Sequence, residues 1–208
     1  MNYQILLAFV LATATLAVSP GPDNIFVLTQ SIANGKRKGL ATVYGLISGC
    51  LVHTSLLAFG VSALIKENES IYFIIKLFGA AYLVYLAFMV CKSPSDINLQ
   101  QKGVTDKSDF QLFKQGFIMN VLNPKVTIFF LAFFPGFLFS ETISALLQFY
   151  ILGLLFMFVS FIIFSLIAIL ASQLSSFIKG NNKVGVVLKW LQVSVFLGIA
   201  VYLLFSNK

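Results

Sequence analysis

The fold is decided by two short stretches, Ser19-Pro20-Gly21-Pro22-Asp23-Asn24 and Asn123-Pro124-Lys125. Each lies near the middle of an apolar run that is long enough to cross a bilayer, and each carries a charge. Proline removes a backbone donor and clashes with the preceding helical turn. Lipid offers no water to the carbonyls that are freed, so such a break is expected to face protein or a wet cavity. Corresponding breaks in the two halves of a chain point to a transporter's binding site.

Composition assigns the chain to the integral membrane proteins. Its 208 residues are 59% hydrophobic and only 10% charged, and the mean hydropathy is +0.94. A soluble domain is nearer half apolar and a quarter charged. The 23 phenylalanines are therefore attributed to a lipid-facing surface.

Charges and cysteines exclude several kinds of site. The net charge is +7, but the basic residues fall in short segments between apolar runs, with no continuous basic face. No nucleic-acid partner is predicted. Cys50 and Cys91 lack metal-ligand spacing, and we interpret both as packing residues. No metal and no cofactor is predicted.

Six apolar runs approach the length of about twenty residues that a bilayer requires. They cover residues 3–32, 39–65, 70–91, 112–139, 142–171 and 186–206. The sequence therefore predicts an all-α polytopic membrane protein with six transmembrane helices. The first and fourth of these are expected to be broken at the proline motifs.

The connections between the runs predict the orientation in the membrane. Lys66 and Lys208 fall on one side, whereas Lys76 and Lys125 lie inside runs. The other side holds the remaining basic residues, Lys36, Arg37, Lys38, Lys92, Lys102, Lys107, Lys114, Lys179, Lys183 and Lys189. Cytoplasmic loops carry an excess of Lys and Arg. We therefore expect the basic loops in the cytoplasm and both termini outside.

The polar segment 92–111 divides one transporter domain, residues 1–208, into two repeats, 1–91 and 112–208. This segment is expected to be a cytoplasmic loop. Three spans per half force the second half to enter the membrane in the opposite sense, which is the geometry of an inverted repeat. Each half also opens with a proline-broken helix.

Asp23 and Lys125 are the most informative charges. A charge near the bilayer centre costs about 2.5–3.5 kcal/mol on insertion scales, so each needs a partner or water. If the halves are related by a pseudo-twofold axis, the two breaks meet near that axis. The two charges then either bind a ligand or form a static ion pair that joins the halves.

The breaks also expose groups that suit a zwitterion. The helical segments after each proline present N-terminal amides to a carboxylate, and carbonyls freed around Leu16, Val18 and Asn120 accept hydrogen bonds from an ammonium group. Lys125 is expected to receive the carboxylate, and Asp23 the ammonium or a proton. Asn24 and Asn123 either contact the ligand or cap the new helices. The predicted substrate site comprises Pro20, Gly21, Pro22, Asp23, Asn24, Asn120, Asn123, Pro124 and Lys125.

Two features of the second run remain open to alternatives. His53 titrates near neutral pH, so it and Asp23 are candidates for proton coupling, although a buried interhelical donor is as good an interpretation of His53. Gly45 and Gly49 form a Gly-x-x-x-Gly motif, which favours close helix packing over a dimer face.

Four ordered segments resemble the lysine exporter (LysE/RhtB) family of bacterial amino-acid efflux transporters. They are Ser19 to Asn24, the turn Gly35 to Gly39 leading into Gly45, Gly49 and His53, Gly79-Ala80-Ala81-Tyr82-Leu83, and Gly116 to Asn120 followed by Asn123-Pro124-Lys125 and Phe133-Phe134-Pro135. The resemblance covers nearly the whole chain. It implies two inverted three-helix repeats in the bacterial cytoplasmic membrane, and efflux of amino acids or related metabolites driven by the proton or membrane gradient.

Other classes of protein fit less well. An intramembrane enzyme needs a nucleophile and base, and the sequence has neither Gly-x-Ser-x-Gly nor a second His. A passive channel would show rings of pore-lining charge. An exporter of metal cations would carry more Cys, His and acidic residues in its spans. The channel and an exporter of a metal cation or another small solute remain the alternatives.

Overall fold

A computed structural model describes residues 3–19, 21–61, 69–92, 107–171, 173 and 183–205. Within these residues every regular element is a helix, so the predicted all-α class is confirmed. The elements are α1 (Tyr3–Val18), α2 (Pro22–Asn34), α3 (Lys36–Leu56), the π-helical turn η1 (Leu57–Val61), α5 (Glu69–Lys92), α6 (Asp109–Val121), α7 (Pro124–Phe133), the 3-10 turn η2 (Phe134–Phe137), α8 (Ala145–Ile169) and α10 (Lys183–Phe205).

Within the described residues, three helical segments are long and apolar enough to cross a membrane. They are Lys36–Val61, Ala145–Ile169 and Gly185–Tyr202. A fourth candidate span is the bent pair α1 and α2, whose axes differ by 57°. The described chain is thus a membrane protein with three or four candidate spans. Its six-helix inverted repeat stays a prediction.

The two proline motifs break their helices as predicted. α1 ends at Val18, and α2 begins at Pro22 after Gly21, whose backbone is extended. α6 ends at Val121, and α7 begins at Pro124, where the Asn123 side chain accepts a hydrogen bond from the backbone N–H of Lys125 at 3.0 Å. Proline suits the first helical position because its missing N–H would have no partner there.

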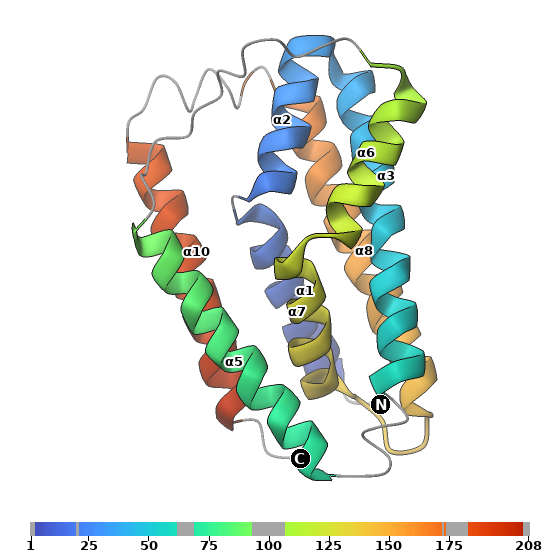
Figure 1. Ribbon diagram of the computed structural model, residues 1–208, viewed down its shortest axis with the longest axis vertical. Coiled ribbons are helices and arrows are strands. Elements are labelled where there is room, and N and C mark those ends of the chain that lie inside the picture. The colour runs from blue at the N-terminus through green and yellow to red at the C-terminus, as the bar shows by residue number, and fades with distance from the viewer. Residues whose placement is uncertain are drawn as a thin grey trace.

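The helices form two groups with α1, α2 and α7 between them (Figure 1). α5 and α10 lie side by side on one flank, and α6 and α8 both pack against α3 on the other. α1 packs against α8 and α10, whereas α7 packs against α5. α2 and α7 start at a similar height near the middle of the molecule and run toward opposite ends (Figure 1). The positive ends of both helix dipoles therefore point toward the centre.

Glycines bring α3 and α6 into close contact. A Cβ atom added at Gly45 would collide with the backbone carbonyl of Phe113, and one added at Gly116 would lie 2.5 Å from the carbonyl oxygen of Thr42. A Cβ atom at Gly49 would also meet α6, 2.8 Å from the Asn120 Cβ. The Gly-x-x-x-Gly motif is therefore used for packing within the chain, as expected.

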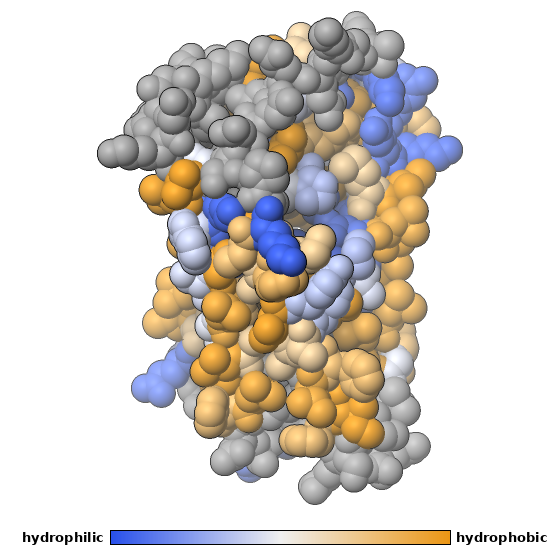
Figure 2. Space-filling view, turned by 60° about the vertical axis from the view of Figure 1, so that its left-hand side comes forward, coloured by the Kyte–Doolittle hydropathy of each residue, from blue (hydrophilic) through white to orange (hydrophobic). Residues whose placement is uncertain are grey.

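Phenylalanine is the most frequent apolar residue of the buried interior, which corrects the expectation that these residues chiefly face lipid. Eight of them are fully buried, namely Phe9, Phe129, Phe130, Phe133, Phe134, Phe137, Phe149 and Phe196. The rings of Phe129 and Phe133 stack with centroids 4.4 Å apart, and Phe9 packs edge-on against Phe134 at 5.0 Å. Exposed apolar side chains, further phenylalanines among them, cover much of the coloured part of the face seen in Figure 2.

Several expectations lie outside the described residues. Pro20, Lys66, Lys208 and most of the segment between the proposed repeats, residues 93–106, belong to this part of the chain. The boundaries of the repeats and the orientation of the termini stay predictions.

Candidate functional site

The two breaks meet although a hundred residues separate them in the sequence. Asn123, at the start of α7, donates a hydrogen bond from Nδ2 to Oδ2 of Asp23 in the first turn of α2, at 3.1 Å. Both side chains are buried. The structure thus brings the two proline motifs together at the centre of the helices.

A cavity of about 40 Å³ lies at this junction. At roughly 10–15 Å³ for each buried water, it has room for about three water molecules. Seven of the predicted site residues line it, namely Gly21, Pro22, Asp23, Asn24, Asn120, Asn123 and Lys125. The remaining walls are supplied by α1, α3, α7 and α8 through Leu16, Ala17, Cys50, Val126, Phe156, Ser160 and Phe164. The cavity therefore joins both broken helices to α3 and α8.

Asp23 and Lys125 both line this cavity. Among the ion pairs of the described residues, none joins the two. Asp23 Oδ1 is buried and has no hydrogen-bond partner among those residues. Lys125 Nζ lies 5.2 Å from the centroid of the Phe196 ring, in a cation–π contact. The two charges attract each other across the cavity. The static ion pair considered from the sequence is not formed.

Polar groups satisfy the carbonyls that the breaks release. Asn24 Nδ2 donates to the carbonyl oxygen of Ala17 at 2.7 Å, which links α2 to α1 across the first break. The carbonyl oxygen of Asn120 accepts from the Asn123 N–H at 3.0 Å and lies 3.1 Å from His53 Nε2. Of the two asparagines considered as caps, Asn123 caps α7, whereas Asn24 joins two helices.

His53 lies beside the cavity rather than in its wall. It is buried in α3, and its ring contacts Phe130 with centroids 5.5 Å apart. Its bond to the Asn120 carbonyl is the interhelical contact that the sequence left as an alternative to proton coupling. Pro124 begins α7 but is likewise not part of the described lining.

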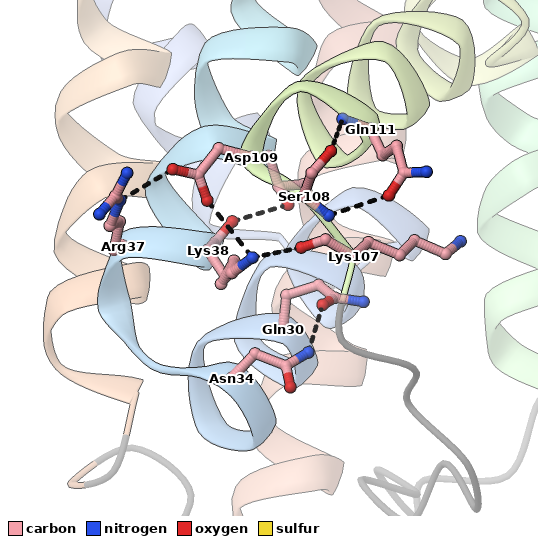
Figure 3. A network of polar contacts seen from close by, with 9 residues as sticks. Gln30, Asn34, Arg37, Lys38, Lys107, Ser108, Asp109 and Gln111 are labelled. Carbon is pink, nitrogen blue, oxygen red and sulfur yellow. Dashed lines mark hydrogen bonds and ion pairs between the residues drawn. The ribbon is translucent and has the colours of Figure 1, made fainter.

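A second polar cluster lies at the end of the molecule where α2 ends and α6 begins (Figure 3). Arg37 Nε is 2.8 Å from Asp109 Oδ2, Lys38 Nζ is 3.5 Å from Asp109 Oδ1, and Lys38 also donates to the backbone carbonyl of Lys107. Ser108 and Gln111 form a capping box that starts α6. We call Arg37, Lys38, Lys107 and Asp109 the end cluster, and it ties the turn between α2 and α3 to α6.

No group of three or more His, Cys, Asp or Glu side chains is close enough to hold a metal ion among the residues that the structure describes. Cys50 instead bonds to the Leu46 carbonyl and the Asn120 side-chain oxygen, each at 3.6 Å.

Sequence reasoning missed the wall that α8 contributes. Ser160 interrupts a nearly continuous apolar run between Leu152 and Phe164, which is the kind of signal that marks an intramembrane polar residue. The flanking Phe156 and Phe164 gave no such signal, because an apolar side chain in a span suits lipid and cavity equally well.

Comparison with known proteins places this chain in a family. Residues 14–207 match the family described as LysE type translocator. The chain is 31% identical over 183 residues to the homoserine/homoserine lactone efflux protein of Salmonella typhimurium and 32% identical to that of Salmonella typhi, in each case over 88% of both chains. It is 27% identical over 182 residues to an uncharacterised membrane protein of Vibrio cholerae, again over 88% of both chains. No solved structure matches.

Proposed function

Because the chain belongs to the LysE type translocator family and is a membrane transporter rather than an enzyme, we propose that it exports a small amino acid or a close derivative from the cytoplasm. The observation that carries this proposal is the central cavity, where two broken helices place opposite charges around one small space. Two relatives are named as efflux proteins for homoserine and homoserine lactone. Homoserine is the zwitterion of these two compounds, and we take it as the first substrate to test.

The ligand is held between the breaks as a zwitterion. Its carboxylate faces Lys125 and the N-terminal end of α7, where the helix dipole favours negative charge. Its ammonium group faces Oδ1 of Asp23, the carboxylate oxygen without a described partner. The separation of the two charges supports this arrangement, since a direct ion pair would leave neither of them available.

Contacts between helices support the inverted repeat. Exchanging the halves maps α1 onto α6, α2 onto α7, α3 onto α8 and α5 onto α10. The contacts of α3 with α8 and of α5 with α10 then map onto themselves, and the contact of α3 with α6 maps onto that of α8 with α1. In this arrangement the end cluster, rich in Lys and Arg, faces the cytoplasm in accordance with the positive-inside rule.

Transport requires the cavity to open alternately to each side. Room for about three waters is far less than an amino acid occupies. The broken helices therefore rock against the others, opening toward the cytoplasm when the end cluster separates and toward the outside when it is closed. Binding at a repeat interface with alternating access is the general behaviour of such transporters.

Proton coupling through Asp23 and His53 completes the proposal. Asp23 lines the cavity, and His53 is connected to it through the Asn120 carbonyl. Moving one positive charge outward against an inside-negative potential costs about 2.3 kcal/mol per 100 mV. A zwitterion avoids this electrical cost, but its concentrative efflux still needs a driving ion.

Flux through proteoliposomes tests the function. Vesicles carrying the purified protein, in the orientation that it has in the cell, are loaded with labelled homoserine. Efflux is then followed at a clamped membrane potential, with and without a pH gradient. The wild type should give saturable efflux that the gradient accelerates. Asp23→Asn should lose the acceleration, whereas Glu141→Gln, which removes an exposed carboxylate, should retain it. Efflux that neither saturates nor responds to the gradient would instead indicate a passive channel.

A further inference from the structure

One wall of the cavity is a face of α8. Phe156, Ser160 and Phe164 follow one another at intervals of four residues, so they lie in a row along the helix. All three line the cavity, and only 1% of Ser160 is exposed. One buried hydroxyl thus lies between two aromatic rings.

The Ser160 hydroxyl differs from those of Ser31 and Ser48, two other serines in these helices. Ser31 and Ser48 each donate to the carbonyl four residues earlier, at 2.7 Å. Ser160 Oγ has no partner among the described residues. Leaving a buried hydroxyl unpaired is unfavourable, and each such group calls for an explanation. Of the buried side-chain atoms that the described structure leaves unpaired, those lining the cavity belong to Asp23 and Ser160.

We infer that Ser160 is a specificity-determining residue whose hydroxyl hydrogen bonds to the side chain of the transported amino acid. This inference rests on the proposed function, in which the breaks hold the ammonium and carboxylate groups. The remaining wall is then left for the side chain. Phe156 and Phe164 enclose its methylene groups, and Ser160 meets a single polar atom.

The chemistry of this wall selects short, uncharged side chains with one oxygen. A hydroxyl both donates and accepts, so it bonds equally to an alcohol or to a carbonyl oxygen. A charged side chain would be enclosed by Phe156, Phe164 and Val126 without a counterion in this wall, which is strongly unfavourable. Basic amino acids should therefore be poor ligands.

Two ligands that differ by one hydroxyl test the inference. L-homoserine and L-2-aminobutyrate are compared as inhibitors of labelled homoserine efflux in proteoliposomes carrying the full-length protein. The wild type should prefer homoserine by about tenfold, as expected for one well-formed hydrogen bond in a buried site. Ser160→Ala should lose this preference by weakening homoserine about tenfold, with little change for aminobutyrate.

Ser165→Ala is the matched control. Ser165 also has an unpaired buried hydroxyl in α8, but it is not part of the cavity lining. This variant should keep the wild-type preference. The melting temperature of ligand-free Ser160→Ala should not fall, because the hydroxyl that is removed has no protein partner, so loss of selectivity cannot be attributed to misfolding.

Four results would contradict the inference. A Ser160→Ala protein that keeps the preference for homoserine, or that weakens both ligands equally, overturns the role of Ser160 while leaving amino-acid efflux intact. The same loss in Ser165→Ala also overturns it. A wild-type protein that transports neither compound overturns the proposed function and this inference with it.

Discussion

At the scale of single residues, the main feature of the site is that its two charged side chains, Asp23 and Lys125, do not pair with each other. Asp23 bonds to Asn123 through one oxygen and leaves the other unpaired, while Lys125 rests against Phe196. A direct salt bridge would neutralise both charges and close the cavity. Keeping the charges apart, at the ends of two half-helices, leaves both of them available to a zwitterion.

Asn24 is predicted to stabilise the first break, because its side chain joins α2 to α1. Asn24→Ala removes the part-buried 2.7 Å hydrogen bond that the Ala17 carbonyl oxygen accepts. The expected loss is about 1–3 kcal/mol, measured by denaturant unfolding in detergent micelles. Asn34→Ala is the control, since the bond that Asn34 makes among the described residues is to Gln30 on the same helix. Equal losses in the two variants would show that the link between α1 and α2 has no special weight.

Sequence and structure agree best on residues whose chemistry is local. Pro22 and Pro124 break a helix whatever neighbours the helix packs against, and Asn123 was recognisable as a cap. The rotation of each helix is not local, because it depends on the packing of every neighbour. For that reason Pro124 and His53 were assigned to the site but do not line the described cavity, and Ser160 was missed.

At the scale of elements, α3 is the helix against which several others pack. It contacts α2, α6 and α8, and its glycines allow the backbone of α6 to approach closely. This contact was predictable, because small residues four apart have few other uses in a membrane helix. The phenylalanine core was not, because a ring that faces protein and one that faces lipid look alike in a sequence.

Gly45→Ala should therefore destabilise the protein. The added methyl group would collide with the Phe113 carbonyl, which belongs to the backbone and cannot turn away. Overpacking of this kind costs about 1–3 kcal/mol, measured as a lower midpoint of unfolding. Gly198→Ala is the control, since nothing lies within 4 Å of a Cβ atom there, and it should not lower the midpoint. A Gly45→Ala protein as stable as the wild type would argue against the close α3–α6 contact.

At the scale of the whole molecule, the proposed alternating access assigns the end cluster a role in controlling access from one side. The cluster joins the turn between α2 and α3 to the start of α6 (Figure 3). Exposed ion pairs contribute only about 0–1 kcal/mol to stability. A bond of this strength can shift the balance between two conformations without preventing either one.

Breaking the end cluster should open the cavity more often. In a Cys91→Ser background, Cys50 is the remaining thiol and lies in the cavity wall. Asp109→Asn should increase the rate at which a maleimide applied from the side of the end cluster labels Cys50, by roughly two- to fivefold for a pair of this strength. Asp109→Glu keeps the charge and should label at the wild-type rate. Identical rates in all three proteins would exclude the cluster from gating.

The central claim is that the two breaks form one site for a zwitterion, and ligand binding to purified Lys125→Gln tests it most directly. Removing the charge while keeping a polar side chain should weaken homoserine about tenfold or more, as for a hydrogen bond to a charged group. The variant should also lose discrimination against homoserinol-type amino alcohols, which lack the carboxylate. Lys125→Arg should retain both properties in part. If Lys125→Gln bound homoserine as tightly as the wild type and still rejected the amino alcohol, the ligand would not lie between the breaks.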